Sequence, residues 1–147
     1  MALRGKLDKR NYKVYVILGD GELDEGLVWE AITAASVYKL DNLVAIVDCN
    51  KFQANGPTKE IYDIGDIKSK FEAFGWKTFK INGHNMKEIV EVLNSVDKIK
   101  GVPSVIIAQT VKGKGISFAE NVTGFHNASL NKEQFKEANF DIENVEL

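Results

Sequence analysis

The residues best suited to chemistry lie where an apolar run gives way to Gly19-Asp20-Gly21-Glu22. Two glycines beside an aspartate let the backbone turn sharply and approach a ligand closely. The preceding run, Val14 to Leu18, is typical of a buried strand, and the helical spacing that follows predicts a helix whose N-terminus favours anions. Ligands of open α/β sheets bind at the carboxyl ends of the strands. This segment therefore predicts a site where a phosphate and a hard cation meet.

A second polar segment, Asp48-Cys49-Asn50-Lys51-Phe52, follows the next apolar run, and Asn50 stands thirty residues after Asp20. If the two strands are neighbours, their carboxyl ends bring these side chains together. Magnesium takes about six oxygen ligands, commonly one or two carboxylates with substrate phosphates. Asp20, Asn50, a backbone carbonyl and two phosphate oxygens would suit it. Gly-Asp-Gly alone is more often an ordinary turn than a metal site, so its placement beside Asn50 is what favours a metal site.

The elements that must position these residues alternate along the chain. Helical spacing of apolar side chains predicts helices at 26–38, around 67–74 and at 89–99, the last with Asn85 and Glu88 as cap and partner. A short helix capped by Asn131 is predicted at 131–138, with no strand after Gly115. Apolar, β-branched runs predict four buried strands: Val14 to Leu18, Leu43 to Val47, Thr78 to Ile81 and Ser104 to Ala108. The sequence thus predicts an α/β fold, with a mainly parallel sheet and helices on both faces.

Composition narrows the class of protein. A chain of 147 residues is the size of one domain, and we expect residues 1–147 to form a single unit. Nineteen basic and twenty-one acidic residues give a net charge of -2, which argues against a nucleic-acid partner. No apolar stretch approaches a membrane span and no signal peptide is apparent, so we expect a cytoplasmic protein without a membrane partner. The single cysteine, Cys49, is interpreted as a core residue.

The pairing of Gly-Asp-Gly with an asparagine some thirty residues later resembles the signature of thiamine diphosphate enzymes. Further segments along almost the whole chain are similar to transketolase in particular. Around the cofactor site these are Gly19-Asp20-Gly21-Glu22-Leu23, Glu25-Gly26 and Trp29-Glu30-Ala31; further along they are Tyr38-Lys39-Leu40-Asp41-Asn42-Leu43, Phe74-Gly75-Trp76, Asn82-Gly83-His84 and Thr110-Val111-Lys112-Gly113-Lys114-Gly115.

The resemblance implies a set of site residues. Asp20, Asn50 and the carbonyl of Phe52 would bind Mg²⁺ or Ca²⁺, and the backbone of Gly21 would contact the diphosphate. Lys112 falls where the family has a cofactor-contacting lysine. His126 matches a histidine that lies near the diphosphate and substrate in the family. The family usually has Trp-His-Gly at this point, whereas this chain has Phe125-His126-Asn127. Glu25 matches a glutamate of an acidic network that links paired active sites; a first-turn glutamate favoured by the helix dipole is an equally good explanation.

The same resemblance implies a thiamine diphosphate fold in partial form. Transketolases carry a segment before the strand at Val14, so we expect this chain to begin inside the ancestral domain and to self-associate through the surface this exposes. We also expect a separate C-terminal subunit that binds the pyrimidine ring, without which the chain would be inactive. Together they would transfer a two-carbon unit between sugar phosphates.

Three other interpretations remain open from the sequence. The chain could be a remnant without catalytic activity, or a component of another thiamine diphosphate enzyme, a 2-oxo acid dehydrogenase or a deoxyxylulose-phosphate synthase. A receiver-like signalling domain phosphorylated on Asp20 or Asp48 is disfavoured, because an adjacent acidic pair is missing after the first strand.

Overall fold

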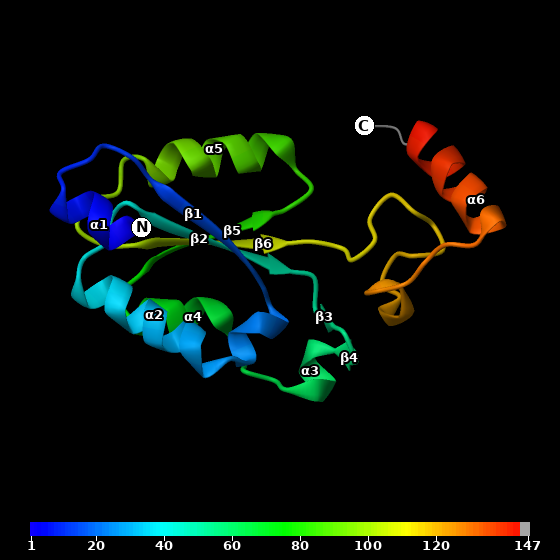
Figure 1. The fold of residues 1–147 in the computed structure, drawn as a ribbon, viewed down its shortest axis with the longest axis horizontal. Coiled ribbons are helices and arrows are strands. Elements are labelled where there is room, and N and C mark those ends of the chain that lie inside the picture. The colour runs from blue at the N-terminus through cyan, green and yellow to red at the C-terminus, as the bar shows by residue number, and fades with distance from the viewer. Residues whose placement is uncertain (145–147) are drawn as a thin grey trace.

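A four-stranded parallel sheet forms the centre of the protein, which we describe over residues 1–144 of a computed structural model. The strands lie in the order β1-β2-β6-β5, and β1 is an edge (Figure 1). The strands are β1 (Val14–Gly19), β2 (Leu43–Cys49), β5 (Lys77–Asn82) and β6 (Ser104–Gln109). All four strands are confirmed, but the burial predicted for them is confirmed only for the central strands β2 and β6; in the outer strands β1 and β5 most residues are partly or fully exposed, Ile17 of β1 to 72%. Because β1 pairs with β2 in parallel, with Gly19 opposite Asp48, the two polar segments do meet, at the carboxyl ends of these neighbouring strands.

Helices cover both faces of this sheet, as predicted. In Figure 1, α5 (Met86–Val96) lies on one face, and α2 (Gly26–Val37) and α4 (Ile67–Ala73) lie on the other. The cap predicted for α5 is present, because the Asn85 side chain accepts hydrogen bonds from the amides of Lys87 and Glu88. The chain also begins with a short helix, α1 (Ala2–Leu7). None of the helices described over residues 1–144 is both long and apolar enough to cross a membrane.

The main core lies between the sheet and α2 and α4. Phe71 is fully buried, and its ring lies 5.3 Å from that of Trp76 and 6.0 Å from that of Trp29. Both indoles find partners for their N–H groups: Trp76 donates to the carbonyl of Ile32 and Trp29 to that of Leu23. The tryptophans therefore act as packing residues. Through Leu23, this core supports the turn that follows Asp20.

Several short elements were not predicted. They are η1 (Gly21–Asp24), the two-residue strands β3 (Phe52–Gln53) and β4 (Gly56–Pro57), which pair in antiparallel fashion, α3 (Thr58–Ile61) and η2 (Thr123–Phe125). Within residues 1–144 no strand follows Gln109, as expected. The last helix, α6 (Lys132–Glu143), is longer than predicted, with Asn131 in a capping box with Gln134. Figure 1 places α6 well away from the sheet.

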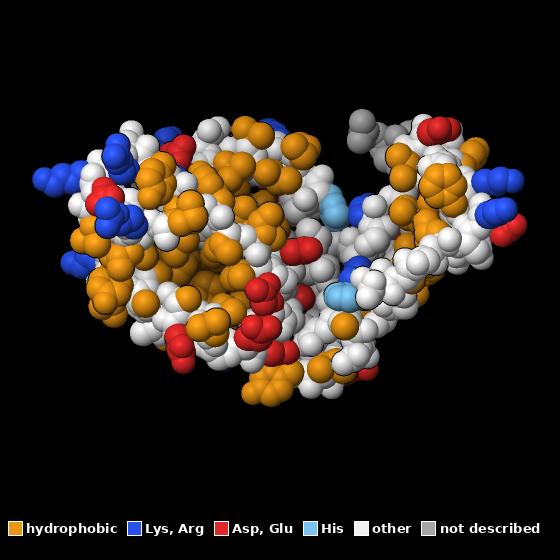
Figure 2. Space-filling view, viewed as in Figure 1, with side chains coloured by type: hydrophobic (Ala, Val, Ile, Leu, Met, Phe, Trp, Pro, Cys, Tyr) orange, Lys and Arg blue, Asp and Glu red, His pale blue; other side chains and the backbone are white. Residues whose placement is uncertain are grey.

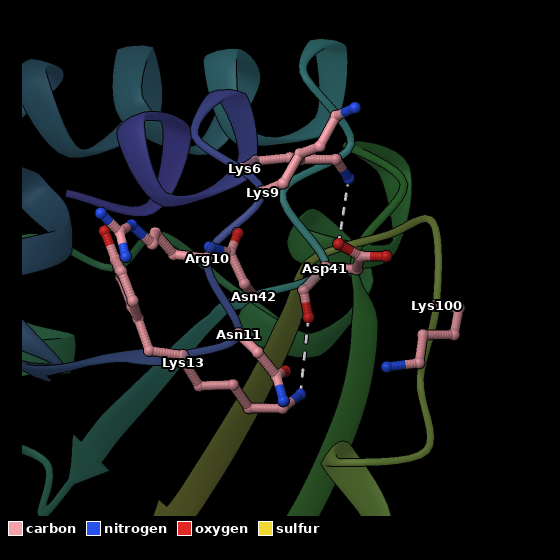
Figure 3. Close-up of a pocket in the computed structure, with 9 residues that line it drawn as sticks. Lys6, Lys9, Arg10, Asn11, Lys13, Asp41, Asn42 and Lys100 are labelled. Carbon is pink, nitrogen blue, oxygen red and sulfur yellow. Dashed lines mark hydrogen bonds and ion pairs between the residues drawn. The ribbon is translucent and has the colours of Figure 1, made fainter.

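The opposite end of the sheet carries a basic pocket of about 340 Å³ (Figure 3). Lys13 donates to the carbonyl of Val96 at the end of α5, and Lys6 donates to that of Lys39 after α2. Cations at helix C-termini offset the negative end of the helix dipole. Figure 3 shows Lys6 and Lys13 reaching toward Asp41 and its backbone, with the Lys100 nitrogen pointing into the same space. The two helix ends thus account for Lys6 and Lys13.

The Asp41 carboxylate links Lys6 to the loop at Gly101, and we predict that its contribution to stability depends on pH. Its carboxylate accepts from the Gly101 amide at 2.8 Å and the Lys6 ammonium at 2.9 Å, and these bonds hold the pKa of Asp41 below its ordinary value near 3.8. A carboxyl whose pKa is lower in the folded state stabilises the protein above the ordinary pKa and ceases to do so on acidification. We expect Asp41→Ala to lower the free energy of unfolding by about 1–2 kcal/mol at pH 7.

Urea denaturation at pH 7 and at pH 3 measures this effect, and the difference between wild type and Asp41→Ala should shrink at the lower pH. Asp97→Ala is the matched control. Its exposed carboxylate lies 3.6 Å from Lys13, and such pairs contribute less than about 1 kcal/mol. An equal loss from both variants would contradict the role given to Asp41.

Candidate functional site

Asp20 is buried at the carboxyl end of β1, with 5% of its surface exposed. Within residues 1–144, no other acidic residue is buried to this degree. One carboxylate oxygen accepts from the Gly21 amide at 2.9 Å, and the other from the Lys51 amide at 2.6 Å. Burial raises the pKa of Asp20 above its ordinary value, and the nearby Asp48 carboxylate adds to the rise. The hydrogen bonds from the Lys51 and Gly21 backbone amides lower the pKa and so oppose this rise. A cation bound to this carboxylate would offset the desolvation cost of its negative charge and its repulsion by Asp48.

The loop after β2 lies directly against Asp20. Lys51, whose amide binds the Asp20 carboxylate, adopts a left-handed backbone conformation with φ 69°. Residues in this region cause the chain to turn sharply. The turn is also closed by the Asn50 side chain, whose Oδ1 accepts from the Phe52 amide at 2.9 Å. The structure thus brings Asp20 together with the loop that carries Asn50 and Phe52, the three predicted metal-binding residues.

Gly21 begins η1 under close packing from β3. A Cβ atom at this position would lie 2.6 Å from Cγ of Gln53, closer than atoms in van der Waals contact. Gln53 in turn donates to the Asp24 carboxylate at 2.7 Å. The Gly21 amide itself donates to Asp20. A side chain at position 21 would therefore have to displace Gln53.

This approach predicts a destabilised Gly21→Ala variant. The added methyl must displace Gln53 and disrupt its bond to Asp24, and overpacking of this kind costs about 1–3 kcal/mol. Gly26→Ala is the matched control, because a Cβ atom added to Gly26 would meet nothing within 4 Å. Thermal denaturation of the two variants makes the comparison. If Gly26→Ala lost as much stability as Gly21→Ala, the contact with Gln53 would not be the cause.

A cavity of about 370 Å³ opens beside Asp20. The residues that line it include Cys49, Lys51, Lys59 and Tyr62. Burial raises the pKa of the Cys49 thiol, so this group stays neutral rather than becoming a nucleophilic thiolate. Two lysines and a buried aspartate among the residues that line one cavity suit a ligand that carries both an anion and a bound cation.

Lys112 and His126 form a second group in the segment between β6 and α6. The Lys112 ammonium lies 3.0 Å from Nδ1 of His126, so the structure brings these two predicted residues together. His84 is exposed, but its Nε2 accepts from the Val111 amide at 2.8 Å and so ties the turn after β5 to this segment. Figure 2 shows both histidines (pale blue) beside the recess that separates the sheet-and-helix body, with its acidic groups (red), from the C-terminal part.

Glu25 stands apart from these contacts. It is exposed at the position that precedes α2, and its carbonyl rather than its side chain makes the capping bond, to the amide of Val28. Glu25 is the N-cap and not a residue of the first turn, so the first-turn explanation is wrong as stated, although its carboxylate still lies at the positive end of the helix dipole. Its side chain is available for contact with another chain.

Three further residues contribute to the site in roles that the sequence did not predict. Gln53 packs over Gly21, Thr110 donates from the end of β6 to the Asp48 carboxylate, and Asp48 accepts from the Asn50 amide at 3.3 Å. The signal for Asp48 and Thr110 was the same as for Asp20, a polar residue at the carboxyl end of an apolar strand. Gln53 carries no such signal.

The donors present fit a divalent metal with a diphosphate. A buried carboxylate, an amide oxygen and a backbone carbonyl are oxygen ligands of the kind that Mg²⁺ takes alongside phosphates. The carboxylate has no cationic side chain bonded to it among the described residues, whose ion pairs all lie elsewhere. Asp20, Asn50 and Phe52 would hold the metal, and the neighbouring lysines would face the anion.

Comparison with known proteins places this arrangement in a family. Residues 4–142 match the family described as "Transketolase, thiamine diphosphate binding domain". Among curated proteins, the chain is 41% identical over 138 residues to a subunit of the apulose-4-phosphate transketolase of Phocaeicola vulgatus, covering 94% of this chain and 49% of that protein. It is 42% identical over 143 residues to the 6-deoxy-6-sulfo-D-fructose transketolase subunit SqwG of Clostridium sp., covering 97% of this chain and 52% of that protein.

Solved structures agree with the sequence matches. The crystal structure of transketolase from Campylobacter jejuni superposes with a TM-score of 0.87 at 33% identity, covering 98% of this chain and 23% of that one. The chain spans about half the length of the subunit-type relatives it matches. The parallel sheet, the paired polar segments at its carboxyl edge and the match over residues 4–142 lead to one assignment: the chain belongs to the family of transketolase thiamine diphosphate binding domains.

Proposed function

We propose that this chain binds thiamine diphosphate and a divalent cation, Mg²⁺ or Ca²⁺, as one component of a transketolase. The buried carboxylate of Asp20 carries this proposal, because it lies against the loop of Asn50 and Phe52 and no cationic side chain is bonded to it among the described residues. Membership of the family supports the cofactor. The metal, the reaction and a cytoplasmic location are the further parts of the proposal.

The chain's own residues would bind and orient the cofactor. Asp20, the Asn50 amide and the Phe52 carbonyl would hold the metal, and the metal would hold the diphosphate at the carboxyl edge of the sheet. Lys112 and His126 would meet the anionic end of the cofactor or substrate from the other side of the recess, with the backbone of Gly21 beside the diphosphate. Thiamine diphosphate, when bound, supplies the carbanion chemistry of the reaction.

The reaction proposed for the assembled enzyme is transfer of a two-carbon ketol unit between sugar phosphates. A separate subunit would contact the pyrimidine end of the cofactor, and the chain alone would be inactive, because half a pocket cannot orient the reacting groups. The names of two relatives as transketolase subunits support a two-chain enzyme. We treat residues 1–147 as a single unit of that assembly, and Glu25 is proposed to face its partner.

We also propose that two copies of the chain associate. β1 is an edge strand, and large apolar side chains on it and on α2 are exposed, among them Tyr15, Ile17, Leu27 and Val37. Figure 2 shows hydrophobic side chains (orange) gathered over the region where β1 and the helix layers lie in Figure 1. Contiguous apolar surface of this kind marks a protein interface.

Isothermal titration with thiamine diphosphate in the presence of Mg²⁺ tests the binding proposal. Saturable binding that is lost on chelation of the metal is expected. A coupled assay of ketol transfer, with the chain and a matching C-terminal subunit mixed, tests the enzyme proposal. Bound cofactor without transfer in the mixture would refute the working enzyme while leaving the binding function in place. No binding at all would identify an inert remnant.

A further inference from the structure

The amide of Asn50 is held at both of its ends. Its Nδ2 donates to Oδ2 of Asp48 at 3.3 Å, and its Oδ1 accepts from the Phe52 amide at 2.9 Å. A side-chain amide has one donor end and one acceptor end, and an ionised carboxylate only accepts hydrogen bonds. Asp48 therefore selects Nδ2 as its neighbour. Rotating the amide by half a turn would set Oδ1 against the carboxylate and Nδ2 against the Phe52 N–H.

Asp48 is itself fixed from the neighbouring strand. The Thr110 hydroxyl, just past the end of β6, donates to Oδ1 of Asp48, and the Thr110 amide donates to the Cys49 carbonyl. Asp48 is also in register with Gly19 on β1 and Ala108 on β6, so its backbone lies within the sheet. Both carboxylate oxygens are thus occupied by donors. A chain of contacts runs from β6 through Asp48 to Asn50.

We propose that Asp48 and Thr110 are positioning residues that fix the orientation of the Asn50 amide, so that Oδ1 is presented for a cation and Nδ2 is kept away from it. The inference rests on the metal site of the proposed function. Cations are bound by the amide oxygen and repelled by the NH₂ group, so the wrong orientation would remove one ligand. Partners that orient a metal ligand in this way typically change metal affinity by about 10-fold to 100-fold when removed.

The first test uses the protein without ligands. Thr110→Val removes the hydroxyl and keeps the shape and the backbone, while Thr110→Ser retains the hydroxyl as matched control. We expect the NMR order parameter of the Asn50 side-chain NH₂ to fall in Thr110→Val and to stay at the wild-type value in Thr110→Ser. Equal order in all three proteins would overturn the proposal. Asp48→Ala should lower the order parameter further, and Thr110→Val still decides the question if that variant does not fold.

The second test measures the Mg²⁺ dissociation constant by titration at saturating thiamine diphosphate. We expect an increase of about 10-fold for Thr110→Val and none for Thr110→Ser. Binding to Thr110→Val as tight as to wild type overturns the positioning role and leaves the proposed function standing. Absence of Mg²⁺ binding by the wild type refutes the proposed function and, with it, the purpose assigned to the orientation of Asn50.

Discussion

Replacing Asp20 by alanine is expected to weaken Mg²⁺-dependent binding of thiamine diphosphate by at least about 100-fold. Asp20 is the buried carboxylate in the proposed donor set, so its loss removes the one negative charge contributed by that set. Removing one partner from a buried pair of opposite charges costs about 3–5 kcal/mol, and 1.4 kcal/mol corresponds to tenfold in affinity. Isothermal titration of the purified chain measures the change, with circular dichroism to establish that the variant is folded.

Asp63→Ala is the matched control for that experiment. Asp63 lines the same cavity, but it is exposed and its carboxylate accepts from the Gly65 amide. It is absent from the proposed set of ligands, and we expect its replacement to change the affinity by less than about threefold. If Asp20→Ala bound as tightly as wild type, the metal would lie elsewhere and the proposed site would be wrong.

Phe71→Ala is expected to lower the free energy of unfolding by about 4 kcal/mol, since Phe→Ala changes in cores cost about 3–5 kcal/mol. Phe71 is fully buried and its ring packs between those of Trp29 and Trp76, so the change leaves a cavity between α4 and α2. Domains have only about 5–15 kcal/mol of net stability. If the wild type lies near the lower limit, about 1 kcal/mol remains and roughly one sixth of the variant is unfolded at 37 °C.

Guanidinium denaturation followed by tryptophan fluorescence gives both stabilities. Phe140→Ala on α6 makes the same chemical change at a side chain that is 65% exposed, and we expect a difference of less than about 0.5 kcal/mol. A loss below about 1 kcal/mol in Phe71→Ala would contradict the packing described for the main core.

The regular elements could be predicted because their apolar patterns are long. The residues of β2 and β6 form continuous apolar runs, and α5 repeats apolar side chains at helical spacing behind the Asn85 cap. Such patterns reflect burial, which in this sheet is greatest for the two central strands. The meeting of Asp20 with the Asn50 loop followed from the same argument, because neighbouring parallel strands end at one edge.

The short elements could not be predicted for the opposite reason. Two-residue strands such as β3 and β4 have no periodicity, and the hairpin that they form, with its turn at 54–55, directly follows Lys51, a non-glycine residue with φ 69°. Nothing in the residue type of Lys51 signals that conformation. The bond from Gln53 to Asp24 depends in turn on this hairpin. The extension of α6 to Glu143 was missed because Phe135, Phe140 and Ile142 are exposed and follow no buried stripe.

The order of strands in the sheet has a consequence for synthesis on the ribosome. β2 pairs with β1 on one side, but its other partner is β6, so that Val44 lies opposite Ser104, sixty residues further along the chain. Parallel pairings between distant residues form late, because the entropy cost of closing a long loop comes before the favourable contacts that offset it. The nascent chain therefore carries β1 and β2 with one apolar edge open until β6 has left the exit tunnel. During that interval the protein is a natural substrate for chaperones that bind extended apolar segments.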